Sequence, residues 1–112
     1  MPIDSHDRDE ARKVFRAAPH FLNCAQSVAS LAGADAQVDG LSGYGGGRAP
    51  GGLCGALHAA LELVPPSRRD ALLRDFEQAV GNQRCADIKR ENQTPCLDCV
   101  AIATQLARRY RD

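Results

Sequence analysis

Residues 43–56 read Gly-Tyr-Gly-Gly-Gly-Arg-Ala-Pro-Gly-Gly-Leu-Cys-Gly-Ala. This stretch leads into a segment of small residues that we expect to be helical, and it places Cys54 at the start of that helix. Glycine adopts positive φ readily and lets the backbone pass close to another group. We interpret the stretch as backbone wrapped around a thiol site, and a flexible glycine-rich loop is the alternative interpretation.

Four more cysteines, Cys24, Cys85, Cys96 and Cys99, are spread over the rest of the chain. The N-terminus is polar and acidic and has no secretory signal pattern, so we expect a cytoplasmic protein. In that compartment, cysteines are more often metal ligands or reactive thiols than parts of a disulfide framework. We therefore expect the five thiols to form one cluster.

The composition limits the classes of partner. The chain has 112 residues, enough for one domain, and its 14 basic and 14 acidic side chains give a formal net charge of zero. Nucleic acids and anionic membranes select basic surfaces, so neither is expected as a partner. No apolar run approaches the roughly 20 residues that span a bilayer. Small helical domains with short apolar stripes often dimerise, so a homodimer is one expectation.

The hydrophobic periodicity predicts an all-α fold, a small bundle of four to five short helices with one long glycine-rich loop. Strand signals are nearly absent. We expect helices over about residues 7–17, 24–31, 53–64, 67–80 and 95–109, a helical turn near Cys85 and Ile88, a polar linker over 89–93, and the loop over 33–52.

Capping residues support these helix boundaries. Asn23 and Gln26 have the spacing of a capping box, as do Asp7 with Glu10 and Ser67 with Asp70. Thr94 followed by Pro95 is typical of an N-cap and the first helical residue. Gly33 and Gly81 are suited to ending helices.

On these boundaries Cys24, Cys54 and Cys96 lie in the first turns of helices. The backbone N–H groups there lack partners within the helix, and the helix dipole favours a negative charge. Both effects lower the pKa of a thiol from about 8.5 towards neutrality, and the thiolate is the form that binds metals and attacks disulfides. His58, four residues after Cys54, could share a metal, but a histidine without that role is the more common case.

The pair Cys96-x-x-Cys99 admits three interpretations. It could form a reversible disulfide, with Cys96 and Cys99 as the catalytic dithiol and Cys96 as the nucleophile. It could supply two thiolates to zinc or to an iron–sulfur cluster. Both thiols could also simply pack in the core, where free cysteine is common. A thioredoxin-like βαβ context is not visible in the sequence.

Taken in order, the motifs resemble the C-GCAxxG-C-C family of redox-active proteins, and the resemblance covers most of the chain. The family is similar to the domain of split-Soret cytochromes, which is helical and associated with an iron–sulfur centre. The haem-attachment motif of those cytochromes is missing here, and Ala59 stands where a later glycine is expected. The motifs that carry the resemblance are Asn23-Cys24-Ala25-Gln26-Ser27-Val28, Gly45-Gly46-Gly47, Gly52-Leu53-Cys54-Gly55-Ala56, Phe76, the step from Gly81 to Cys85, and Cys96 with Cys99.

This resemblance implies a small electron-transfer protein with an iron–sulfur cluster, expected to be [2Fe–2S]. Its first-choice ligands are Cys24, Cys54, Cys85 and Cys96, and Cys99 is a substitute. Gly46, Gly47, Gly52 and Gly55 would supply backbone N–H groups to the bound sulfur. Two alternatives stay open: a metal-free thiol/disulfide redox protein, and a structural zinc-binding or interaction module without turnover. The sequence does not name a redox partner protein.

Overall fold

The computed structural model describes residues 5–18, 21–44, 48–92 and 94–111. Within these ranges the chain is all-α and contains no named strand, which confirms the predicted fold class. Two isolated β-bridges, Phe15 to Leu22 and Leu53 to Arg84, join separate segments. The α-helices are α1 (Ser5–Val14), α2 (Cys24–Leu31), α3 (Gly55–Leu63), α4 (Arg69–Val80), α5 (Cys85–Asp87) and α6 (Cys96–Tyr110).

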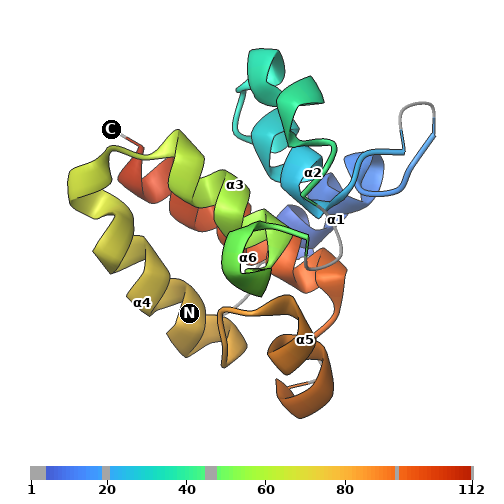
Figure 1. Cartoon of the computed structure of the whole chain (residues 1–112). Helices are drawn as coiled ribbons and strands as arrows, with labels where there is room; N and C mark the ends of the chain where they lie inside the picture. The colour runs from blue at the N-terminus through green and yellow to red at the C-terminus, as the bar shows by residue number, and fades with distance from the viewer. Residues whose placement is uncertain (1–4, 19–20, 45–47, 93, 112) are drawn as a thin grey trace.

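Helix α6 is the centre of the bundle and contacts α1, α2, α3 and α4. Figure 1 shows it, in orange to red, running behind α3, with α4 on one side and α1 and α2 on the other. Buried alanines line the faces of α6 and α3, which pack against each other, and larger apolar residues fill the rest of the core. The largest buried side chains include Phe76, Leu57, Leu72, Ile102 and Leu106.

Two predicted helix ends are confirmed by the geometry of their caps. Asn23 accepts a hydrogen bond from the Gln26 backbone N–H at 2.7 Å, and the Gln26 side chain accepts one from the Asn23 N–H at 3.0 Å. Gly81 ends α4 with φ +104, a conformation that favours glycine. Helix α2 consequently has the predicted boundaries, with Cys24 as its first residue.

Other predicted caps are wrong. Helix α1 begins at Ser5, so Asp7 lies inside its first turn instead of capping it. Pro66–Arg68 forms a 3-10 turn, so α4 begins after Ser67 and has Arg68 as its N-cap. Pro95, with extended φ and ψ, is the N-cap of α6, and the Thr94 hydroxyl instead donates to the Val80 carbonyl at 3.4 Å.

The segments expected to be irregular contain ordered turns. The described part of the loop holds three 3-10 turns, η1 (Asp35–Gln37), η2 (Asp39–Leu41) and η3 (Pro50–Gly52). The expected polar linker is instead a π-helical turn, η5 (Ile88–Asn92), continuous with α5 and anchored by the buried Ile88. In Figure 1 this α5–η5 segment lies at the end of the molecule where α6 begins.

No helix in the described ranges is long and apolar enough to cross a lipid bilayer.

Candidate functional site

All five cysteines line one cavity of about 40 Å³. They come from the start of α2, the residue before α3, the start of α5 and the first turn of α6. None is joined to another in a disulfide. A cavity of this size holds roughly three water molecules. The fold therefore brings thiols from distant parts of the chain to the ends of four helices around a small space.

We call the three buried cysteines that line the cavity, together with Gly55, its floor. Cys24, Cys54 and Cys99 are exposed by only 8%, 5% and 3%. Gly55, the first residue of α3, is buried beside them. A Cβ atom at Gly55 would lie 2.6 Å from Cys24 Sγ and would overlap the Tyr44 carbonyl oxygen. The floor thus requires glycine at this position, because the backbone there lies directly against a sulfur atom.

Cys54 and Cys99 form a hydrogen-bonded thiol pair on this floor. The S–H of Cys99 donates to Cys54, and this bond is the main cause that lowers the pKa of Cys54 from 9.0 to about 7. Hydrogen bonds from the backbone N–H groups of Leu57 and Ala56, in the first turn of α3, lower the pKa further, and the positive charge of Lys89 contributes in the same direction. Burial opposes these effects but does not outweigh them.

The same bond acts on Cys99 in the opposite direction. Its role as the donor, together with burial and the neighbouring thiols, raises the pKa of Cys99 far above its ordinary value. Cys99 therefore stays protonated while Cys54 ionises. The backbone holds the pair in place from both sides: the Cys54 N–H donates to the Gln83 carbonyl at 2.9 Å, and the Cys99 N–H donates to the Pro95 carbonyl at 3.2 Å.

Cys85 and Cys96 lie higher in the cavity and are partly exposed. Partial burial raises the pKa of the Cys85 thiol, and the ammonium group of Lys89 lowers it only in part. The thiols of Cys96 and Cys85 in turn raise the pKa of Lys89. Lys89 is exposed and also lines the cavity, so it lies at the mouth as a cation.

Arg16 is the second cation at the mouth and was not predicted from the sequence. It follows α1 with φ +54, a left-handed conformation that is uncommon for residues other than glycine. Its backbone N–H donates to the Leu22 carbonyl at 2.9 Å, and its guanidinium lies 4.8 Å from the centre of the Phe15 ring. This turn ends α1 at Val14, three residues before the predicted end. The sequence carries no glycine or turn motif that would have indicated it.

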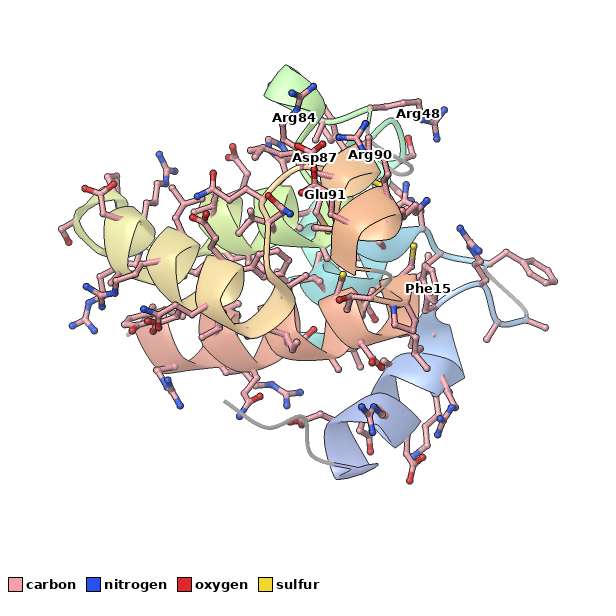
Figure 2. The ribbon with its side chains drawn as sticks, turned by 90° about the horizontal axis from the view of Figure 1, so that it is seen from below. Phe15, Arg48, Arg84, Asp87, Arg90 and Glu91 are labelled. Carbon is pink, nitrogen blue, oxygen red and sulfur yellow. The ribbon has the colours of Figure 1, made fainter. Side chains whose placement is uncertain are left out.

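Figure 2 shows Phe15 beside the start of α6 and near the sulfur atoms, which are drawn in yellow. The labelled charged residues of α5 and η5 lie on the outer side of that segment, away from Phe15. Arg90 pairs there with Asp87 at 2.9 Å and with Glu91 at 3.4 Å. The ion pairs of this segment are thus separate from the cavity.

The predicted glycine contacts have different outcomes. Gly55 lies against a sulfur atom, as described above. Gly52 has φ +74 and lies instead next to the Arg84 guanidinium, with an added Cβ 3.2 Å from Arg84 Nε. Gly46 and Gly47 lie outside the described residues. His58 packs on the Tyr44 ring, with 4.6 Å between the ring centroids, and does not line the cysteine cavity.

The cysteines, all of which the structure describes, do not form a metal site of the usual kind in this conformation. Among the residues that the structure describes, no group of three or more His, Cys, Asp or Glu side chains is placed to hold one metal ion. The four expected cluster ligands, Cys24, Cys54, Cys85 and Cys96, share the cavity but are not arranged around a common point.

No protein family, curated protein sequence or solved structure matches this chain.

Proposed function

We propose that this protein is a thiol/disulfide redox protein in which Cys54 is the attacking thiolate and Cys99 is the resolving thiol. The observation that carries the proposal is the buried Cys54–Cys99 pair, in which the pKa of Cys54 is lowered to about 7. A thiol is most effective in exchange reactions when its pKa is close to the ambient pH. Cys99 is already within hydrogen-bonding contact of the sulfur that it would attack.

The exchange follows from this arrangement. The Cys54 thiolate attacks one sulfur of a substrate disulfide, RSSR, forming a Cys54–SR bond and releasing RS⁻. In the mixed disulfide Cys54 no longer carries the negative charge that raises the pKa of Cys99, so Cys99 can lose its proton. The Cys99 thiolate then attacks Cys54 Sγ, the second R group leaves as a thiolate that takes up this proton, and a Cys54–Cys99 disulfide forms. The two protein thiols are oxidised, and the substrate disulfide is reduced to two thiols.

The test is to treat the reduced protein with the neutral reagent bis(2-hydroxyethyl) disulfide and to identify the first disulfide by peptide mapping. We expect Cys54–Cys99. Cys54→Ser should slow the reaction by about a hundredfold or more, because a hydroxyl group does not replace a thiolate nucleophile. Cys85→Ser is the matched control and should change the rate little. A Cys96–Cys99 disulfide as the first product would contradict the assignment and favour the C-x-x-C dithiol.

A second candidate is the iron–sulfur cluster that the motif resemblance implies. The supporting observation is that Cys24, Cys54, Cys85 and Cys96 line the same cavity. Cluster binding would require these thiols to move into a common coordination sphere. Anaerobic purification followed by iron and sulfide assays tests this role, and a colourless, iron-free protein after reconstitution would rule it out.

A further inference from the structure

The mouth of the cysteine cavity is positively charged. Arg16 and Lys89 are its exposed charged residues, and the lining residues that the structure describes include no Asp or Glu. The acidic residue next to Cys99, Asp98, does not line the cavity and is paired with Arg8 at 3.1 Å. The acidic residue nearest in sequence to Cys85, Asp87, is paired with Arg90 at 2.9 Å. The neutral net charge of the chain therefore conceals a local excess of cations at this opening.

Both cations are held at the mouth by local structure. Arg16 is fixed by its left-handed backbone, by its hydrogen bond to Leu22 and by the Phe15 ring beneath its guanidinium. Non-glycine residues with such a backbone persist only when the surroundings enforce it, and they concentrate at functional sites. Lys89 belongs to the π-helical turn η5, which brings its ammonium group close enough to Cys85 to hydrogen-bond that thiol.

The size of the cavity limits how a substrate could bind. A volume of about 40 Å³ admits a reacting sulfur atom but not a complete organic disulfide. The remainder of such a molecule must lie at the mouth, against Arg16 and Lys89. A negative group there would interact with both cations, and the same cations would stabilise the departing thiolate.

We propose that the cavity selects small anionic disulfides, with Arg16 and Lys89 as the residues that determine this charge specificity. The inference rests on the thiol exchange proposed above and names the substrate class of the same site. Neither residue takes part in the exchange of bonds; each positions the negative end of the substrate while its disulfide sulfur meets Cys54.

The experiment compares three disulfides that differ only in their terminal groups: 3,3′-dithiodipropionate (anionic), bis(2-hydroxyethyl) disulfide (neutral) and cystamine (cationic). The rate of Cys54–Cys99 disulfide formation is measured by peptide mapping and divided by the rate of each reagent with 2-mercaptoethanol. We expect the anionic reagent to react about tenfold faster than the cationic one after this correction, and we expect 1 M salt to reduce the ratio.

The variants Arg16→Gln and Lys89→Gln should each reduce this ratio to about threefold, and the double variant should abolish it. The matched controls are Arg12→Gln and Lys13→Gln, which remove the same charges from exposed positions outside the cavity. A ratio near one in the unmodified protein, or an equal loss in the control variants, would overturn the charge specificity while leaving the exchange reaction intact. Failure of all three reagents to form the Cys54–Cys99 disulfide would overturn both proposals.

Discussion

A cysteine on the floor of the cavity and a cysteine near its mouth have pKa values shifted in opposite directions. Cys54 on the floor is almost fully buried, yet its pKa is lowered to about 7. Cys85 near the mouth is partly exposed and has a lysine beside it, yet its pKa is raised. Burial alone predicts the reverse order, because removing water disfavours a thiolate.

The difference lies in the direction of the hydrogen bonds and dipoles around each sulfur. Cys54 receives a bond from Cys99 and lies in the field of the N-terminus of α3. The group that lowers the pKa of Cys85 is the exposed ammonium of Lys89, and Cys85 begins a helix of three residues. A fixed donor together with a longer helix outweighs desolvation, whereas a single exposed cation does not. The lowered thiol pKa is therefore found on the floor and not near the mouth.

The largest change in stability is expected from Gly55→Ala, which disrupts the packing of the floor. The new Cβ would overlap the Tyr44 carbonyl oxygen and lie 2.6 Å from Cys24 Sγ. Because the backbone must shift to relieve the overlap, we expect a loss of about 3 kcal/mol in the free energy of unfolding. Urea denaturation followed by circular dichroism measures the loss.

Gly43→Ala is the control for Gly55→Ala. Gly43 belongs to the same glycine-rich stretch, but nothing lies within 4 Å of an added Cβ and its φ is not positive. We expect a change of less than about 0.5 kcal/mol at this position. Equal losses in the two variants would mean that general stiffening of the loop, and not contact with the floor, explains the requirement for glycine.

The sequence predicted where the cysteines of the floor lie along the helices better than it predicted which of them contact each other. The capping box of Asn23 and Gln26 predicted the start of α2 and so placed Cys24 correctly, because both hydrogen bonds of the box join residues three apart in the sequence. Local patterns likewise placed Cys96 at a helix start. Cys54 was expected inside the first turn of a helix and is instead the N-cap of α3. The contact between Cys54 and Cys99, however, depends on how α3 packs against α6, and no local pattern encodes that packing.

The mouth was predicted less well because its structure depends on tertiary context. The polar composition of residues 89–93 indicated a linker, but the buried Ile88 holds this segment in a helical turn that places Lys89 at the cavity. Arg16 was expected inside a helix, yet its hydrogen bond to Leu22 holds it in a left-handed turn. Each of these features depends on a contact that the residue types alone do not specify.

An effect of intermediate size is expected on the pH dependence of the free energy of unfolding, because Cys54 on the floor has a lower pKa than an ordinary thiol. The folded pKa of Cys54, about 7, lies below its ordinary value of 9.0. Its contribution to stability is therefore absent below about pH 7, grows between pH 7 and 9 and is complete above pH 9. We expect the free energy of unfolding to rise by about 2 kcal/mol across this range.

Above pH 9 the trend should reverse. Cys99 and Cys85 have raised pKa values in the folded state, so ionisation of the unfolded chain then favours unfolding. Urea denaturation of the reduced protein from pH 6 to 10 measures the profile, and Cys54→Ser is its control, since it should flatten the rise below pH 9. A rise of the same size in Cys54→Ser would assign the pH dependence to another group.

The smallest and most specific effect is expected from changing only the donor on the floor. Cys99→Ala removes the S–H group, so the pKa of Cys54 should rise by about one unit, the size expected from losing a single hydrogen bond to a charged group. Cys99→Ser keeps a hydroxyl donor at the same place and should leave the pKa near its original value. The pH dependence of Cys54 alkylation by iodoacetamide, followed by peptide mapping, measures both. If Cys99→Ala leaves the pKa near 7, the backbone N–H groups at the start of α3 and the charge of Lys89 must stabilise the thiolate without help from a thiol pair. If both variants raise it equally, the effect is one of packing, because the serine hydroxyl then fails to substitute for the thiol as a donor.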